Sequence, residues 1–153
     1  MKKEQFIHVD SNGTKRYYSD REHENRHRED GPAVEYENGD KGWYINGKLH
    51  REDGPAVEWA DGTKSWWFDG KCHREDGPAV VWSNGDKEWW VEDELHREDG
   101  PAGEFADGSK EWWVNGEKLT EAEFNARMNP VELTLEDIAE KFGVSVDRIK
   151  VKK

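Results

Sequence analysis

The residues best suited to chemistry in this chain form the tetrad His-Arg-Glu-Asp, which occurs four times and is followed each time by Gly-Pro-Ala. The tetrad histidines are His27, His50, His73 and His96, so the copies are 23 residues apart. An imidazole beside two carboxylates and a guanidinium offers the groups of a metal site or of an acid–base pair. A zinc or catalytic site is therefore the first hypothesis to test.

The constant spacing of the tetrads argues against that hypothesis, because a fixed period of this size indicates a repeat array. Two strands per repeat, about 4.8 Å apart, would place equivalent histidines roughly 10 Å from each other. A zinc-bound imidazole nitrogen lies about 2.1 Å from the metal, so one column of histidines cannot share an ion. We predict no metal, no cofactor and no catalytic residue. The predicted structural corners are His27, Asp30, His50, Asp53, His73, Asp76, His96 and Asp99.

Each repeat has the sequence pattern of a β-hairpin. In the second copy, the alternating runs 55–59 and 64–68 flank an Asp-Gly pair at 61–62. Such a pair between alternating runs is a strong short-range signal for a hairpin turn. The sequence therefore predicts an all-β repeat array, in which antiparallel hairpins with a 23-residue period form a curved, elongated sheet.

The two ends of the predicted array are atypical, as capping units are. Residues 31–119 hold the four repeats, and residues 1–30 are predicted to be a degenerate N-terminal capping repeat with about three extra loop residues. Residues 120–153 are predicted to form a small C-terminal helix-helix-strand cap. We expect this α/β cap to close the open edge of the last hairpin.

Local signals define the elements of the C-terminal cap. Thr120 begins a capping box that opens a helix to about Met128, and residues 134–137 open a second helix with Gly143 as its C-cap. The alternation over 144–151 predicts a final strand. Residues 134–145 are similar to the first helix and turn of a helix-turn-helix DNA reader, but only eight residues follow, too few for a recognition helix.

A two-residue turn at 61–62 would place Val57 opposite Trp66, with Phe68 on the same core side of the ribbon. The other side would then carry a column of rings edged with carboxylates. These partner-binding candidates are Tyr44, Trp67, Trp90, Trp113, Glu35, Glu58 and Glu104. Two interpretations of the ring column stay open. The rings are covered by folding or mutual stacking, or they are an exposed surface for a partner or a cationic ligand.

The composition indicates a folded, acidic protein. Only 33% of residues are hydrophobic, but nine are tryptophans, and disordered chains are poor in aromatic residues. Residues 1–30 and 123–153 are each neutral, so residues 31–122, which hold the repeats, carry the whole net charge of −12. This charge disfavours direct binding to nucleic acid and to anionic membranes. We expect no signal peptide and a cytoplasmic location, and we expect Cys72 to be a small core residue in the slot of Leu49 and Leu95.

The 23-residue period and the Gly/aromatic pattern of residues 38–47 resemble MORN-type repeats and their variant form. The string His-Arg-Glu-Asp-Gly-Pro-Ala resembles that of small bacteriophage-encoded repeat proteins. The resemblance covers residues 27–122 and implies a curved β array that acts as a binding scaffold, without a chemistry of its own. MORN proteins linked to membranes use basic surfaces, whereas this array is acidic.

The favoured hypothesis is a non-catalytic phage or mobile-element protein that binds and inhibits a host protein, in the host cytoplasm. The partner would be a component of antiviral defence whose basic nucleic-acid-binding groove is engaged by the carboxylates of the array. One alternative is an aromatic ladder that binds choline, a nucleotide or a glycan, as similar rings do in cell-wall proteins. Another alternative is a structural or assembly scaffold that self-associates.

Overall fold

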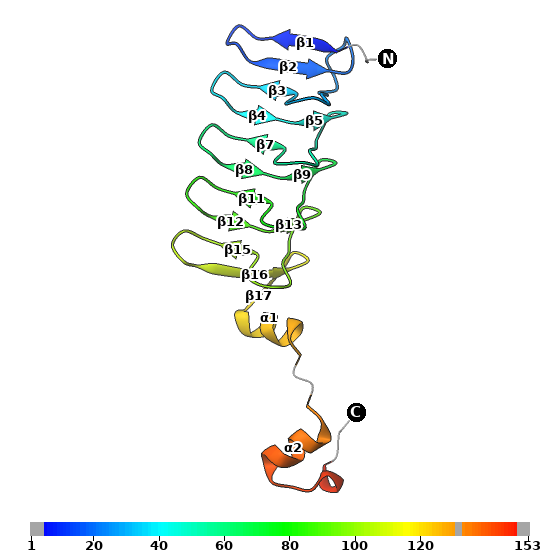
Figure 1. Ribbon diagram of the computed structural model, residues 1–153, viewed down its shortest axis with the longest axis vertical. Coiled ribbons are helices and arrows are strands. Elements are labelled where there is room, and N and C mark those ends of the chain that lie inside the picture. The colour runs from blue at the N-terminus through cyan, green and yellow to red at the C-terminus, as the bar shows by residue number, and fades with distance from the viewer. Residues whose placement is uncertain (1–4, 131–132, 150–153) are drawn as a thin grey trace.

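The structure is a computed structural model that describes residues 5–130 and 133–149. It is an elongated ladder of antiparallel β-hairpins followed by short helices, which confirms the predicted fold class (Figure 1). Eleven strands form one continuous sheet, in the order in which they follow along the chain. These strands are β1 (Phe6–Val9), β2 (Lys15–Tyr18), β3 (Val34–Glu35), β4 (Lys41–Gly42), β7 (Val57–Glu58), β8 (Lys64–Ser65), β11 (Val80–Val81), β12 (Lys87–Glu88), β15 (Gly103–Glu104), β16 (Lys110–Val114) and β17 (Glu117–Leu119).

Each of the first three repeats makes a second, smaller hairpin beside the main sheet. The pairs are β5 (Tyr44–Ile45) with β6 (Lys48–Leu49), β9 (Trp67–Phe68) with β10 (Lys71–Cys72), and β13 (Trp90–Val91) with β14 (Glu94–Leu95). Both turn residues have positive φ, for example 50° at Asn46 and 80° at Gly47. Two-residue turns of this kind match the twist of the strands that they join. The third copy forms the same turn without glycine, at Glu92 and Asp93.

The first turn of each repeat is longer than predicted, which changes the register. The amide of Trp59 donates to the carbonyl of Thr63, and only Gly62 within this loop has positive φ, at 94°. The loop therefore has three residues and ends in a glycine bulge. Val57 lies opposite Ser65, so the predicted pairing of Val57 with Trp66 is wrong by one residue.

The corrected register separates the side chains onto two faces, because a shift of one residue moves every side chain to the other side of a strand. One face, which we call the aromatic face, carries Val57, Ser65 and Trp67, since the Trp67 indole Nε1 donates to Ser65 Oγ at 2.6 Å. The other, which we call the arginine face, carries Glu58 and Lys64 as cross-strand neighbours. Equivalent positions in the other repeats follow the same division.

The core is a thin band along the ladder. The alanines of the Gly-Pro-Ala strings are fully buried in all four copies. Cys72 forms a buried cluster with Ala79 and Val80, and Trp67 and Trp90 pack against it. Burial raises the pKa of the Cys72 thiol to about 12, so the group stays a neutral thiol at physiological pH.

The two predicted helices are present with the predicted caps. Helix α1 (Glu121–Met128) and helix α2 (Leu135–Phe142) both begin at a threonine capping box, and α2 ends at Gly143 in the left-handed conformation. Helix α1 packs against β16 and β17 and buries Phe124. The described helices are too short to cross a membrane.

The strand predicted over 144–151 is wrong for its described part. The amide of Val144 donates to the carbonyl of Ala139, which continues the α2 cap, and residues Val146–Arg148 form a short 3-10 helix, η1. A strand needs a free sheet edge, and α1 already lies against the last strands of the ladder (Figure 1). Residues 150–151 lie outside the described part of the chain.

Candidate binding face

The tetrad arginine joins consecutive repeats on the arginine face. Arg51 donates from Nε to Asp53 Oδ1 at 2.8 Å and from one terminal nitrogen to the carbonyl of Pro55 and to Glu58 Oε1, at 3.2 and 3.1 Å. Its guanidinium carbon lies 4.2 Å from the centre of the Trp43 ring. Arg51 and Trp43 belong to one repeat, and Pro55 and Glu58 belong to the next. The arginine therefore ties the two repeats together.

The same stack recurs at every tetrad. The other pairs are Arg28 with Tyr17, Arg74 with Trp66, and Arg97 with Trp89. Tyr17 precedes Arg28 by 11 positions, whereas Trp43 precedes Arg51 by 8, which is the difference expected from three extra loop residues. The stack at Arg74 lacks a glutamate, because Val81 stands where Glu58 stands.

The glycine that follows each tetrad leaves room for the arginine. A Cβ atom on Gly54 would lie 3.0 Å from the guanidinium carbon of Arg51, and the other three corners are equally tight. This distance is shorter than ordinary van der Waals contact. The string His-Arg-Glu-Asp-Gly-Pro-Ala is therefore a joint between repeats, in which the arginine folds back over the glycine.

The tetrad histidine accepts a hydrogen bond from the next repeat. The amide of Asp69 donates to His50 Nδ1 at 3.1 Å, and Asn115 donates likewise to His96. A neutral imidazole that accepts at Nδ1 carries its proton on Nε2. The arginine of the same corner, by contrast, donates to a backbone carbonyl and to the corner aspartate. Among the described residues, no group of three or more potential metal ligands converges.

The arginines also set the ionisation of the corner aspartates. The hydrogen bond from Arg51 holds the pKa of Asp53 below its ordinary value, and the charge of Arg51 acts in the same direction. Arg74 and Arg97 lower the pKa of Asp76 and Asp99 in the same way. These carboxylates are therefore ionised throughout the physiological pH range.

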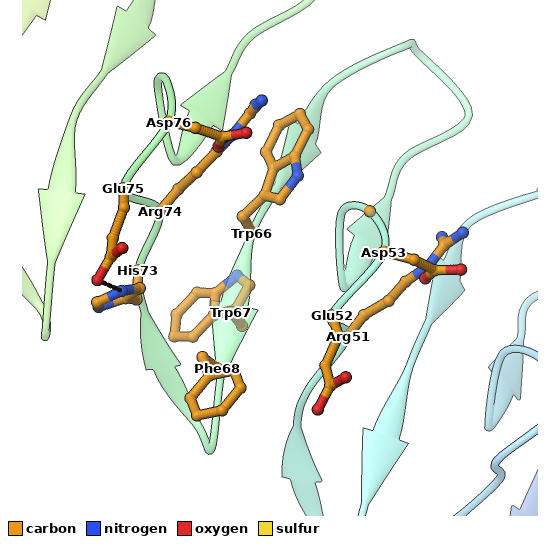
Figure 2. A pocket seen from close by; sticks show the side chains of 11 residues that line it. Arg51, Glu52, Asp53, Trp66, Trp67, Phe68, His73, Arg74, Glu75 and Asp76 are labelled. Atoms are coloured by element: carbon orange, nitrogen blue, oxygen red, sulfur yellow. Dashed lines mark hydrogen bonds and ion pairs between the residues drawn. The ribbon is translucent and has the colours of Figure 1, made fainter.

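Open recesses lie between successive corners. The recess in Figure 2, of about 490 Å³, is lined by the corner residues 51–54 and 73–76 and by Trp66, Trp67 and Phe68. Two similar recesses occur one repeat before and one repeat after it. Arg51 and Arg74 are both paired with aspartates of their own corners. The charges of the recess are thus largely satisfied within the protein.

The predicted ring column lies on the aromatic face, where its members are half-buried. Three of its indoles donate to the residue two positions earlier: Trp67 to Ser65, Trp90 to Glu88 Oε2 and Trp113 to Glu111 Oε2, the last two at 3.0 Å. Tyr44 lies over Gly42, where a Cβ atom would come within 2.8 Å of its ring. We call this set Tyr44, Trp67, Trp90 and Trp113 the inner column.

A second set of rings, which the sequence interpretation missed, lies on the same face nearer the first turns. This outer column consists of Tyr36, Trp59, Trp82 and Phe105. Each of these rings comes two residues after the residue that pairs across the hairpin with Gly42, Ser65, Glu88 or Glu111. Tyr36, Trp59 and Trp82 are 42%, 38% and 44% exposed. Three of the four rings of the outer column are therefore open to solvent over part of their surface. A prediction of three residues instead of two in the first turn would have placed these four rings on one face from the sequence alone.

The predicted carboxylates lie on the opposite face from the predicted rings. Glu35, Glu58 and Glu104 point to the arginine face and pair with Arg28, Arg51 and Arg97 at 2.8 to 3.1 Å. The structure therefore does not bring the seven candidate residues together. The carboxylates among the rings are Glu88 and Glu111 instead.

The chain matches no model of a known protein family, and no curated protein is significantly similar to it in sequence. The resemblance to MORN-type repeats therefore stays a prediction, and the function has to be argued from the geometry of the two faces.

Proposed function

We propose that this protein is a non-catalytic binding protein whose aromatic face docks onto a partner protein. The observation that carries the proposal is the pair of ring columns on the aromatic face, with three outer rings about 40% exposed. Contiguous exposed apolar patches mark interaction sites, and aromatic residues are enriched among the residues that dominate interface energies. The arginine face is a poorer candidate, because its charged groups pair with one another.

The charge of the array favours a basic partner. Four repeats of about 10 Å each carry the net charge of −12, or one charge per roughly 3.3 Å. A single DNA strand carries one charge per about 3.4 Å. This similarity supports a partner that otherwise holds nucleic acid in a basic groove. Complementary charge would speed association and exclude acidic proteins.

We further propose that the chain is carried by a phage or mobile element and blocks such a host protein in the cytoplasm. The resemblance of the tetrad string to phage-encoded repeats supports this view. We propose a defence nuclease as the host protein, because it would hold nucleic acid in a basic groove and a phage would gain from its inhibition.

Affinity capture from a bacterial lysate at low and moderate salt tests the proposal. The wild type is compared with the variant Tyr36→Thr, Trp59→Thr, Trp82→Thr, since threonine retains a preference for strands. The matched control replaces the exposed lysines Lys41, Lys64 and Lys87 of the arginine face by threonine. We expect the ring variant to lose the captured protein and the lysine variant to retain it. Retention by the ring variant, or no specific capture by the wild type, contradicts the proposal.

A small ligand such as choline, a nucleotide or a glycan is the second candidate, and one contact favours a cation among these. The ammonium of Lys118 lies 5.3 Å from the centre of the Trp113 ring, so this face already holds a cation. Tryptophan fluorescence titrated with choline, nucleotides and glucans separates the two candidates. A saturable response to one of them supports the ligand function, and flat responses leave the protein partner.

A further inference from the structure

One lysine of the chain occupies a carboxylate–indole site on the aromatic face. Lys118 is the cross-strand neighbour of Trp113, and its Nζ is bonded to Glu111 Oε1. The other carboxylate oxygen, Glu111 Oε2, accepts from the Trp113 indole at 3.0 Å. The ammonium therefore contacts both a carboxylate and the face of a ring.

The same site recurs one repeat earlier without its lysine. The Trp90 indole donates to Glu88 Oε2 at 3.0 Å, as Trp113 does to Glu111. The cross-strand neighbour of Trp90 is Leu95, which brings no charge. No cation of the described residues pairs with Glu88, although its side chain is only partly exposed. The Trp90 indole is the one hydrogen-bond donor to this carboxylate among the described residues, so its other oxygen is available to a cation from a partner.

The surroundings of Glu88 also differ from those of the earlier repeats. Gly103 pairs with Glu88 on one side and with Glu111 on the other, where the preceding copies have a valine. A Cβ atom on Gly103 would lie 3.1 Å from the ring of Phe105, so this ring lies over the backbone between the two glutamates. An apolar ring beside a carboxylate suits a side chain with an alkyl stem and a charged end.

We propose that Glu88, Trp90 and Phe105 bind the side chain of a lysine from the partner protein. This inference rests on the proposed function and specifies the chemistry of the partner. The ammonium would lie between the Glu88 carboxylate and the Trp90 ring, as that of Lys118 does at Glu111 and Trp113. Cation–π attraction and a charge-assisted hydrogen bond then act together. The first two repeats lack the site, because Gly42 and Ser65 stand in place of the glutamate.

NMR of the indole Nε1–H signals, titrated with tetralysine at constant ionic strength, tests the site. We expect the Trp90 signal to shift in a saturable manner and the Trp113 signal to stay unchanged. Glu88→Gln keeps an acceptor for the Trp90 indole but removes the charge, so the apparent affinity should fall roughly tenfold or more. The matched control Glu98→Gln removes one equally charged, highly exposed carboxylate at a corner and should leave the response intact.

Two exchanges between the repeats sharpen the test. Lys118→Leu empties the second site, so the Trp113 signal should begin to respond, and Leu95→Lys fills the first site, so the Trp90 response should disappear. A silent Trp90 in the wild type, or an unchanged response in Glu88→Gln, overturns the lysine site. Affinity capture through the outer column would still report on the proposed function separately, because that column lies outside the Glu88 site except for Phe105.

Discussion

The arginine face and the aromatic face differ in how constant their residues are from one repeat to the next. On the arginine face, the arginine, its aspartate, the proline carbonyl and a ring recur in every copy with nearly the same distances. On the aromatic face, rings recur, but the residue beneath the inner column changes from Gly42 to Ser65, Glu88 and Glu111. The constant string of the chain therefore holds the repeats together, and the variable residues lie on the face where we propose that a partner binds.

The physical reason for this division is that each repeat contacts only its neighbours. The stability of such an array is a sum over repeats and the interfaces between them. Arg51 crosses one of these interfaces, since it bonds Pro55 and Glu58 of the following repeat. A change in the tetrad would weaken an interface directly, whereas a change at an exposed ring would not.

The largest expected effect is that of removing one arginine. Arg51→Ala loses a ring contact and charge-assisted hydrogen bonds and leaves Glu58 without its cation, so the free energy of unfolding should fall by about 2–3 kcal/mol. Urea denaturation followed by tryptophan fluorescence measures it. A loss below about 0.5 kcal/mol, as at ordinary surface sites, would remove the basis for distinguishing the two faces.

The third corner sharpens this comparison within the arginine face. Arg74→Ala should cost about 1 kcal/mol less than Arg51→Ala, because Val81 replaces the glutamate and fewer charge-assisted bonds are lost. The two variants are compared by urea denaturation in the same buffer. Equal losses would mean that the Arg51–Glu58 pair adds nothing to the interface.

A ring of the outer column should matter less for stability. Trp82→Thr is expected to lower the free energy of unfolding by about 1 kcal/mol, since the ring is 44% exposed and threonine suits a strand. Its capture of the partner should nevertheless decline, while Arg51→Ala protein that remains folded should still capture it. If Trp82→Thr lowered the free energy of unfolding more than Arg51→Ala but captured the partner better, the assignment of stability to the arginine face and of binding to the aromatic face would be reversed.

The smallest expected effect is the response to acid. The arginines hold the pKa of Asp53, Asp76 and Asp99 in the folded protein below the unfolded value. These aspartates therefore stabilise the folded protein at pH values above the ordinary aspartate range. That stabilisation is lost as the pH falls through their lower, folded-state pKa. The melting temperature should stay level from neutral pH to about 4 and then decline. Asp53→Asn should lower it at neutral pH, and the difference from wild type should shrink in acid.

Elements set by local chemistry could be predicted from the sequence, and elements that depend on a distant partner could not. Both helices begin at threonine capping boxes, which act within four residues, and both were predicted with their ends. The final strand was predicted from alternation alone, but a strand exists only where another strand can bond to it. Trp67 and Glu58 were assigned to one face because the first turn was taken as two residues instead of three.

The sequence by itself determined the 23-residue period, the hairpins, the helix caps and the location of the net charge on the array, because all of these follow from spacing, short-range conformational preference and composition. Only the tertiary structure decided that the tetrad is a joint, that the rings and the predicted glutamates lie on opposite faces, and that Glu88 stands among the rings without a cation from the described residues. The bonds that decide these points join successive repeats, such as the one from the Asp69 amide to His50, or depend on the register within a hairpin. Neither can be read from one repeat alone.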